Sequence, residues 1–421
     1  MTLAVLYRNA RVHCPGDPRA TALLVRGNRI AWLGPDAEAP AADATVDLAG
    51  AVVTPAFVDA HVHTTDTGIV RLGLDLAGSR SSMEVLDRLA AHVRSLPADA
   101  VVVGQGWEES GWSPRRPPGA SELDRAGGGR RVYLAQASVH SAAVSTALLA
   151  EVPPDVPGWD GSGWLRRDAH HRAREVAMGS LTAAQRRSAQ QAALRYAAQC
   201  GIAAVHECGG PGTSGEADFQ AVLSLSGQRL PEVYGYWGEL GAVAKARELG
   251  ATGAGGDLYA DGALGAQTAY LRTPYADTDG CGHGYLTAEQ VAAHLVECTE
   301  AGLQGGFHAI GDKAIATVLA GFALAAAKVG LPRLRALRHR VEHLEILDKQ
   351  LIAGLVEFDV VASVQPAFDR LWGGEHGMYA TRLGVARSLA SNPIGALAGV
   401  GVTLALGSDS PVTPLDPWGS V

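Results

Sequence analysis

The chain has 421 residues, of which 47% are apolar and 19% are charged, and its formal net charge at pH 7 is -8. This composition supplies enough apolar side chains for a large core and excludes a disordered chain, a collagen and a small disulfide scaffold. The mild excess of acidic residues argues against nucleic acid as a partner, because phosphate binding requires a basic surface. The length fits one large domain with a smaller one.

The five cysteines are an odd number and contain no CxxC pair. We therefore expect reduced thiols and a cytoplasmic protein. The first residues show no signal-peptide pattern. The longest strongly apolar stretch, 315–327, is shorter than the roughly 18 residues that a membrane helix needs, so no membrane partner is expected.

Residues 1–53 contain short runs of alternating polar and apolar residues, separated by turn residues. The runs cover 3–13, 20–34 and 44–55, and Arg-Gly-Asn at 26–28 marks a turn within the second. This pattern predicts a small antiparallel unit of short strands ahead of the main domain.

From residue 54 to residue 421, apolar strand-like runs alternate with alanine-rich helical segments. The predicted strands are 56–63, 202–207, 232–237, 257–262, 303–310, 338–343, 360–366 and 402–409, and the clearest helices are 181–201, 287–302 and 312–330. Strands that alternate with helices in this way predict an α/β fold, a parallel (β/α)8 barrel of the TIM type.

The interval of about 64–180 is much longer than one strand-to-helix connection needs. It contains two strand-like runs of its own, 99–107 and 130–140, and a stretch rich in proline and glycine, 111–120. We interpret it as an insertion after the first barrel strand, of the kind that shapes a substrate pocket.

Four histidines and an aspartate fall at the ends of predicted strands. His61 and His63 end the first strand and share one face, His308 and His343 end the fifth and sixth, and Asp409 ends the eighth. Barrel enzymes build their sites at these strand ends. Imidazoles together with a carboxylate are typical of a catalytic zinc site, and manganese or iron also accept this ligand set.

Six motifs occur in order along the chain: VTPAFVDAHVHT, YADGALGAQTA, GGFHAIGDKA, RHRVEHLE, SVQPAF and LALGSDSPV. Together they resemble the metal-dependent amidohydrolase superfamily, and within it the YtcJ-like (amidohydrolase 3) branch, which includes N-substituted formamide deformylase. The resemblance implies a barrel combined with an N-terminal β-sandwich portion. It also implies hydrolysis of a carbon–nitrogen bond that is not a peptide bond, such as that of an amide or N-substituted formamide.

Residue by residue, the resemblance makes His61, His63, His308, His343 and Asp409 the metal ligands. A divalent metal, most simply zinc, makes hydroxide available near neutral pH. Asp409 is then the general base that takes a proton from water and returns it to the leaving nitrogen. His343 is assigned a second catalytic role, polarising the carbonyl.

Asp257 departs from the family pattern, because members commonly have at this position a lysine that becomes carboxylated and bridges two metals. Aspartate is several atoms shorter, so we hypothesise one metal ion held by His61, His63, His308 and Asp409. Asp257 remains a candidate ligand, and two ions would mean that it replaces the lysine.

Five residues are candidate substrate contacts. Trp107, Glu108 and His140 lie in the insertion, Asp261 follows Asp257 with strand spacing, and Gln365 lies near the end of the seventh strand. An ordinary structural role is the alternative for each.

Family members continue well beyond the segment that matches Asp409. We therefore expect the N-terminal strands to lack partners, which leaves open sheet edges that are compatible with a homodimer.

Two other functions stay open. A hydrolytic deaminase of a heterocycle uses the same single-metal site and releases ammonia. A barrel that binds a small molecule without catalysis is the alternative outside the enzymes.

Overall fold

The computed structural model describes residues 3–421 apart from 15, 110, 138–140 and 212. It divides into two compact units, Met1–Phe57 and Val58–Val421. Each unit has its own sheets and its own core, and each is described by itself below.

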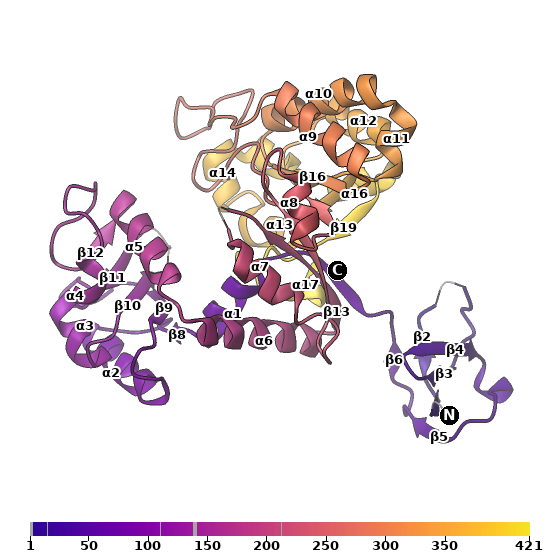
Figure 1. The fold of residues 1–421 in the computed structure, drawn as a ribbon, viewed down its shortest axis with the longest axis horizontal. Coiled ribbons are helices and arrows are strands. Elements are labelled where there is room, and N and C mark those ends of the chain that lie inside the picture. The colour runs from indigo at the N-terminus through magenta and orange to yellow at the C-terminus, as the bar shows by residue number, and fades with distance from the viewer. Residues whose placement is uncertain (1–2, 15, 110, 138–140, 212) are drawn as a thin grey trace. The chain divides into compact units, whose positions relative to one another are not determined.

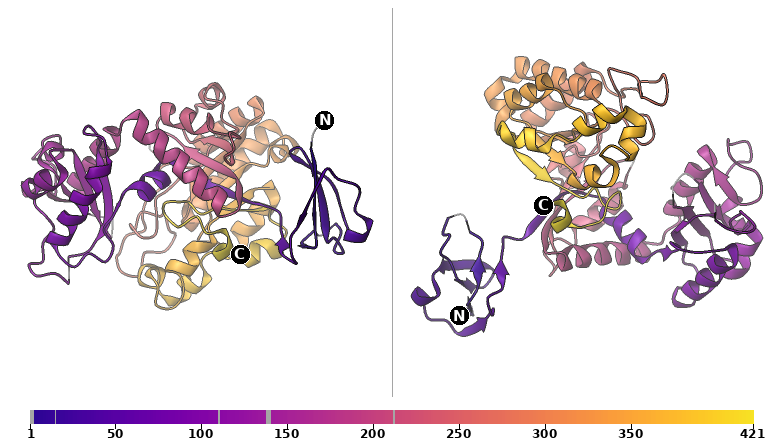
Figure 2. Two further views of the ribbon diagram at one scale, coloured as in Figure 1. Left: turned by 90° about the horizontal axis from the view of Figure 1, so that it is seen from below. Right: turned by 180° about the vertical axis from the view of Figure 1, so that it is seen from behind.

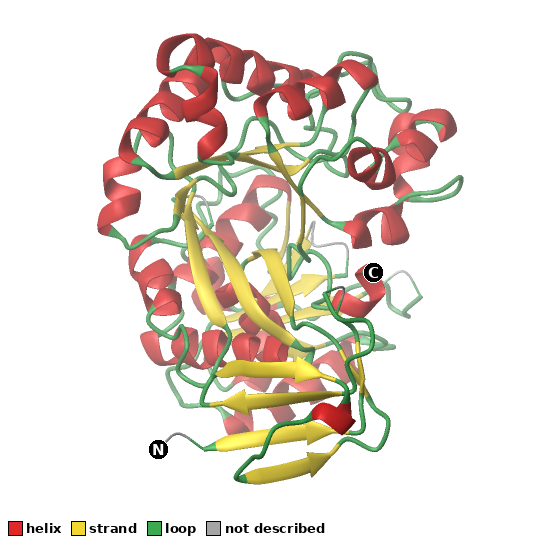
Figure 3. Ribbon diagram, turned by 90° about the vertical axis from the view of Figure 1, so that its right-hand side faces the viewer, coloured by secondary structure: helices red, strands yellow, loops and turns green. Residues whose placement is uncertain are grey.

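The first unit is a small β structure (Figure 3). Its main sheet has the order β4-β3-β1-β5, and β2 and β6 form a separate pair. The strands are β1 (Ala4–Arg8), β2 (Arg11–Val12), β3 (Ala22–Arg26), β4 (Arg29–Gly34), β5 (Ala44–Asp47) and β6 (Val52–Val53). Pairing is antiparallel for β1–β3 and β3–β4, as predicted, but parallel for β1–β5 and β2–β6. The prediction of a wholly antiparallel unit is wrong, because local patterning does not show that β5 returns alongside β1.

The second unit contains, among the described residues, an eight-stranded sheet with the order β19-β18-β17-β16-β15-β14-β13-β7. The strands are β7 (Phe57–Val62), β13 (Ile202–Gly209), β14 (Glu232–Trp237), β15 (Gly253–Ala254), β16 (Gln304–Ala309), β17 (Arg340–His343), β18 (Val361–Val364) and β19 (Leu404–Leu406). Neighbouring strands from β13 to β19 pair in parallel. The sheet nearly closes on itself, which confirms the predicted TIM-type barrel.

The two end strands of this sheet meet just beyond their carboxyl ends. Val62 forms a parallel bridge with Ser410, and the backbone N–H of His63 donates to the Ser410 carbonyl oxygen at 2.9 Å. The N–H of Asp409 donates to the carbonyl oxygen of His61 at 2.8 Å. The junction therefore brings the first and last candidate ligands together through the backbone.

The fourth barrel strand differs from the prediction of 257–262. The strand is β15 (Gly253–Ala254), and Gly255 and Gly256 end it. A Cβ at Gly255 would lie 2.3 Å from Gly306 N, so the chain passes too close to β16 for any larger residue, and Gly256 has a φ of +82°. Asp257 consequently follows the strand, and only the bridge between Tyr259 and His308 continues the pairing.

Helices cover the outside of the barrel, and Figure 1 shows α9 to α12 grouped on one side. The helices are α1 (Thr64–Leu72), α6 (Ala183–Gln199), α7 (Glu216–Leu223), α8 (Val243–Glu248), α9 (Ala288–Ala301), α10 (Asp312–Val329), α11 (Leu331–Ala336), α12 (Lys349–Phe358), α13 (Pro366–Trp372), α14 (Met378–Leu383), α15 (Val385–Ala390), α16 (Ile394–Gly399) and α17 (Pro417–Ser420). Capping boxes begin α6 and α9, at Thr182 and Thr287, and Gly302 ends α9 with a φ of +70°. The largest core packs β16, β17 and β18 against α9, α10 and α12.

Between α1 and α6 the chain builds a further α/β layer, drawn in purple shades in Figure 2. Its sheet has the order β12-β11-β10-β9-β8. The elements are β8 (Leu74–Asp75), α2 (Ser82–His92), β9 (Val102–Trp107), α3 (Ala120–Gly127), β10 (Val132–Gln136), β11 (Ser141–Val144), α4 (Thr146–Leu149), β12 (Trp164–Arg166) and α5 (Arg167–Gly179). The helices on either side of this segment, α1 and α6, pack closely against each other. A Cβ on Gly68 of α1 would lie only 1.9 Å from the carbonyl oxygen of Ala189 in α6.

Candidate metal centre

The four candidate histidines converge at the carboxyl ends of the barrel strands. The ring centroids of His61 and His63 are 5.4 Å apart, those of His61 and His343 are 5.1 Å apart, and those of His308 and His343 are 4.5 Å apart. His61, His308 and His343 are buried, and His63 is partly exposed. The apolar runs that end in these residues fold as strands whose ends meet on one rim.

Two carboxylates lie among the imidazoles. Asp257 Oδ1 is 3.5 Å from His61 Nε2, 3.5 Å from His308 Nδ1 and 3.7 Å from His343 Nε2, while its Oδ2 is 3.1 Å from His63 Nε2. Asp409 Oδ1 is 3.1 Å from His63 Nε2 and 3.5 Å from His61 Nε2. The structure therefore places Asp257 at the centre of the histidines, with each of its oxygens facing different rings.

The mutual charges of these groups dominate their titration. Burial disfavours the charged form of His63, yet its contacts with Asp257 and Asp409 raise its pKa well above the usual value. Burial also disfavours the charged form of His61, but the neighbouring Cys208 and the same two carboxylates raise its pKa well above the usual value. Burial likewise opposes ionisation of Asp257 and Asp409, but the nearby histidines hold the pKa of both carboxyl groups below their usual range. The cluster is thus arranged to hold negative charge on its carboxylates.

The ligand atoms fit a metal ion. His61 Nε2, His308 Nδ1 and Asp257 Oδ1 are buried and make no hydrogen bond to the described residues. Such atoms are costly unless a cation or a proton satisfies them. Two groups each bring three ligand atoms within 4.8 Å of one another, one of His61, His63 and Asp409 and the other of His61, Asp257 and His343. Imidazole nitrogens and carboxylate oxygens are the donor set of zinc, manganese and iron sites.

Hydrogen bonds on the outer side of three rings fix their orientation. His61 Nδ1 lies 2.8 Å from Glu342 Oε2, His63 Nδ1 lies 3.0 Å from the Cys208 carbonyl oxygen, and His343 Nδ1 lies 2.8 Å from Gln365 Oε1. Because all three partners accept, each ring donates from Nδ1 and turns the lone pair of Nε2 towards the centre.

Sequence reasoning missed Glu342 and its partner Arg340. Both belong to RHRVEH, which was interpreted only as a strand ending in a ligand. The signal was present, since two charged residues with strand spacing stand in a run that the barrel buries on both faces.

Two of the candidate residues hold an uncommon backbone conformation. His343 has a φ of +74° and Asp409 a φ of +55°. Residues other than glycine adopt this region rarely and at some energetic cost, and such positions concentrate at functional sites.

The five predicted substrate contacts fall in different places. Gln365 contacts the ring of His343, as described above, and Glu108 is exposed in the insertion. Asp261 is fully buried and accepts the backbone N–H groups of three later residues, so we correct its assignment to a structural role. His140 lies outside the described residues.

Trp107 also requires correction. Its side chain is 0% exposed in the core of the insertion, and its indole N–H donates to the Leu134 carbonyl oxygen at 2.8 Å. The alternation of side chains along β9 places Trp107 on the inner face of the insertion's sheet. A side chain that fills this core cannot line a cavity. Its role is packing.

A cavity of about 340 Å³ opens beside the candidate ligands. One wall is aromatic: the Phe368 ring stacks at 6.0 Å and 8° on His343, Trp372 follows at 4.8 Å from Phe368, and Tyr379 at 6.2 Å from Trp372. Glu345 also borders the cavity, and burial raises the pKa of its carboxyl group to about 7. No lysine or arginine stands among the described residues that line it.

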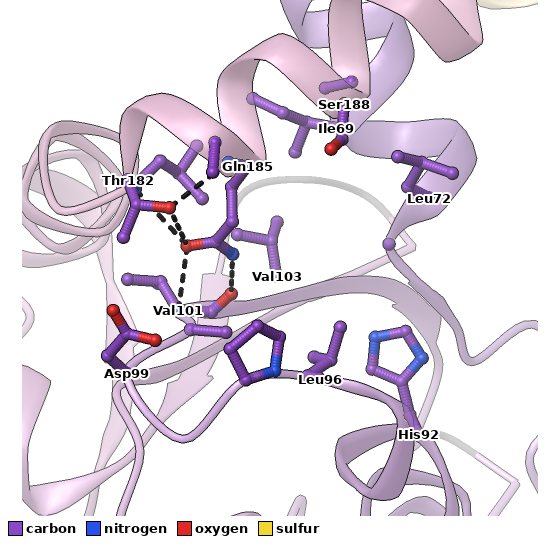
Figure 4. Close-up of a pocket in the computed structure, with 16 residues that line it drawn as sticks. Ile69, Leu72, His92, Leu96, Asp99, Val101, Val103, Thr182, Gln185 and Ser188 are labelled. Atoms are coloured by element: carbon purple, nitrogen blue, oxygen red, sulfur yellow. Dashed lines mark hydrogen bonds between the residues drawn. The ribbon is translucent and has the colours of Figure 1, made fainter.

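A second cavity, of about 350 Å³, lies between α1, α6 and the segment before β9 (Figure 4). Gln185 joins its sides, donating from Nε2 to the Val101 carbonyl oxygen at 2.8 Å and accepting from the Val101 N–H at 3.3 Å. Its lining is mainly apolar, and neither candidate metal-binding group lies in it. The first cavity, which the candidate ligands line, is therefore the candidate reaction site.

A nearly closed parallel barrel with histidines and aspartates at its carboxyl-end rim defines a barrel hydrolase. The model of the amidohydrolase family matches residues 44–421. The chain belongs to this family, which confirms the predicted resemblance, and it is a hydrolase acting on carbon–nitrogen bonds.

Relatives are similar over much of the chain. The putative amidohydrolase YtcJ of Bacillus subtilis (strain 168) is 27% identical over 399 residues, which are 88% of this chain and 73% of that protein. The N-substituted formamide deformylase of Arthrobacter pascens is 31% identical over 153 residues, 35% of this chain and 28% of the relative.

Among solved structures, an uncharacterized metal-dependent hydrolase from Pyrococcus furiosus shares the fold. Its TM-score is 0.81 at 23% identity, with 99% of this chain and 87% of the other covered.

No helix in the described part of this chain has the length and apolar character needed to cross a membrane.

Proposed function

We propose that this chain hydrolyses the carbon–nitrogen bond of small, uncharged amides, N-substituted formamides among them, at a single divalent metal ion. His61, His63, His308 and Asp409 hold the ion, which is most simply zinc, and Asp257 is a further candidate ligand whose carboxylate helps to balance its charge. The observation that supports this most directly is the set of buried ligand atoms without hydrogen-bond partners, gathered around two carboxylates. A bound divalent ion supplies Lewis acidity that activates water for attack on the amide.

The chain's own residues supply the proton transfers. Asp409 borders the cavity and is kept ionised by the neighbouring histidines. It takes a proton from the attacking water at a carboxylate oxygen and passes it to the leaving nitrogen, which departs as the amine. His343 lines the same cavity, and its second role is to polarise the carbonyl of the substrate.

The cavity supports an uncharged substrate. Its described lining offers carboxylates, histidines and an aromatic wall but neither lysine nor arginine. A substrate carboxylate placed against that wall would lose its hydration with no cation to pair with, which is costly. A neutral apolar substituent can instead lie on Phe368 and Trp372.

The decisive experiment measures the metal content of protein purified without chelator, for the wild type, His61→Ala and His171→Ala. His171 is an exposed histidine on α5 and serves as the matched control. We expect about one equivalent in the wild type and in the control and a large loss in His61→Ala. A wild type without metal would contradict the proposal, and two equivalents would overturn the single-ion arrangement.

A panel of amides then tests the chemistry with the metal-loaded protein. Neutral N-substituted amides should release an amine and a carboxylic acid, and matched acidic analogues should react poorly. Release of ammonia from heterocycles would favour the deaminase instead. Metal uptake with no hydrolysis in the panel would favour a binding barrel.

A further inference from the structure

A buried ion pair stands directly behind one candidate ligand. Arg340 and Glu342 lie on the same face of β17 and are 1% and 0% exposed. The guanidinium contacts both carboxylate oxygens, with Nε 2.5 Å from Oε1 and Nη2 2.8 Å from Oε2. The same Oε2 lies 2.8 Å from Nδ1 of His61. A continuous chain of hydrogen bonds therefore runs from Arg340 through Glu342 to Nδ1 of His61, whose Nε2 faces the candidate ligands.

Contacts from several strands hold the guanidinium itself. Nη2 donates to the Ala60 carbonyl oxygen at 2.6 Å and to Ser363 Oγ at 2.7 Å, and Nη1 lies 2.9 Å from His206 Nδ1. The guanidinium also lies 4.4 Å from the centre of the Tyr236 ring. Because these partners come from β7, β13, β14 and β18, the ion pair is fixed relative to the whole barrel.

The partner behind His61 differs in kind from those behind the neighbouring rings. His63 donates to a backbone carbonyl and His343 to a side-chain amide, which are neutral acceptors. Any such acceptor fixes the tautomer of the imidazole, and a negatively charged carboxylate polarises the ring more strongly than a neutral acceptor does. Glu342 can remain ionised in the barrel interior because Arg340 pairs with it in bidentate geometry.

We propose that Arg340 and Glu342 are positioning residues for the metal ion, acting through His61. Glu342 accepts the Nδ1–H of His61 and so keeps the lone pair of Nε2 directed at the centre, and the bidentate contact with Arg340 holds Glu342 in place. This inference rests on the proposed metal-dependent function.

The test compares the wild type with Glu342→Gln and with the double variant Arg340→Met/Glu342→Gln. Glutamine can still accept from His61 through its oxygen, but it carries no charge. In Glu342→Gln the buried Arg340 guanidinium loses its carboxylate partner, which destabilises the protein. The double variant also removes this unpaired guanidinium. Folding is checked by thermal unfolding of the metal-free proteins, and Zn²⁺ affinity is measured by competition with a chromogenic chelator.

We expect Zn²⁺ affinity to fall roughly 10- to 100-fold in the folded variants, as it does when such outer partners are lost elsewhere. The visible absorption spectrum of the Co²⁺-loaded protein should change as well, because the field of one ligand has weakened. Glu122→Gln is the matched control: Glu122 forms the same bidentate contact with Arg116 but lies in the insertion. Its Zn²⁺ affinity should equal that of the wild type.

A folded double variant with wild-type Zn²⁺ affinity and an unchanged Co²⁺ spectrum would overturn the inference, since a purely structural pair affects only unfolding. That result would leave the proposed function intact. A wild type that takes up no Zn²⁺ would overturn both. The two failures are therefore distinguishable.

Discussion

Asp261→Asn is expected to destabilise the barrel rather than weaken substrate binding. Asp261 Oδ2 accepts the N–H groups of Tyr270 and Gly311, each at 2.8 Å, and Oδ1 accepts that of Ile310 at 3.0 Å. These bonds tie the segment after Asp261 to the turn between β16 and α10, beside His308. The side chain is fully buried and lies outside the lining of the cavity.

The size of the effect follows from the number of donors. Asparagine has one carbonyl oxygen, which can keep the two bonds at the Oδ2 position, but its amide N–H groups then face the N–H of Ile310. One bond to a charged acceptor, worth about 1.5–3 kcal/mol, is lost, and a buried donor is left unpaired. We therefore expect a loss of about 2–4 kcal/mol in the free energy of unfolding.

The assay is urea unfolding followed by far-UV circular dichroism, together with steady-state kinetics on the best amide. Asp312→Asn is the control, because Asp312 also accepts a backbone N–H, that of Arg272 at 2.9 Å, but on the exposed surface. Its effect should stay within about 0.5 kcal/mol. An Asp261→Asn protein of wild-type stability with a raised KM would refute the structural assignment and restore the substrate contact.

Three further expectations concern single side chains. Asp409→Asn should lower kcat by roughly 10²- to 10⁴-fold at saturating metal, because the base and acid of the reaction is lost, and an unchanged kcat would contradict that role. Asp257→Asn should reduce metal content, measured by elemental analysis, because asparagine removes the carboxylate nearest to the four rings; full retention would show that Asp257 is not a ligand. Burial lowers the pKa of His339 to about 4, against 6.5 in the unfolded chain. Between pH 4 and pH 6.5 the unfolded chain therefore binds a proton at His339 that the folded chain does not bind. Stability should therefore fall as the pH drops from 6.5 to 4, by up to about 3 kcal/mol. His339→Gln should flatten this dependence in urea unfolding at several pH values, whereas an unchanged slope would exclude His339 as the cause.

The barrel and the convergence of the candidate ligands were predictable because both depend on local patterns. Each candidate is a histidine or aspartate that ends an apolar run and is followed by a helix. Once parallel strands close into a barrel, such a residue lies at the carboxyl-end rim. The fourth strand was misplaced because Gly255 and Gly256 interrupt the alternation on which strand prediction depends. Trp107 was misassigned because the sequence of a turn does not say which face of a strand is covered by another layer.

The outer partners of the ligands could not be identified from sequence for a different reason. Glu342 and Arg340 contact residues of four other strands, and which of them are neighbours depends on the register of the whole sheet. Two charged residues in a buried strand indicate only that each must have a hydrogen-bonding or charged partner in the fold. Their identity is a property of the tertiary structure.

The hypothesis of a single metal ion now rests on the charge balance of the site rather than on the length of the Asp257 side chain. Asp257 was expected to be too short to bridge two metal ions in place of the carboxylated lysine, yet its Oδ2 lies 3.1 Å from His63 Nε2 while its Oδ1 lies 3.5 Å from His308 Nδ1. The backbone after the Gly255–Gly256 break brings the short side chain to the centre. One divalent ion is balanced by the two carboxylates Asp257 and Asp409 with neutral imidazoles, whereas two ions would leave uncompensated positive charge in a buried site. Electroneutrality therefore favours a single ion.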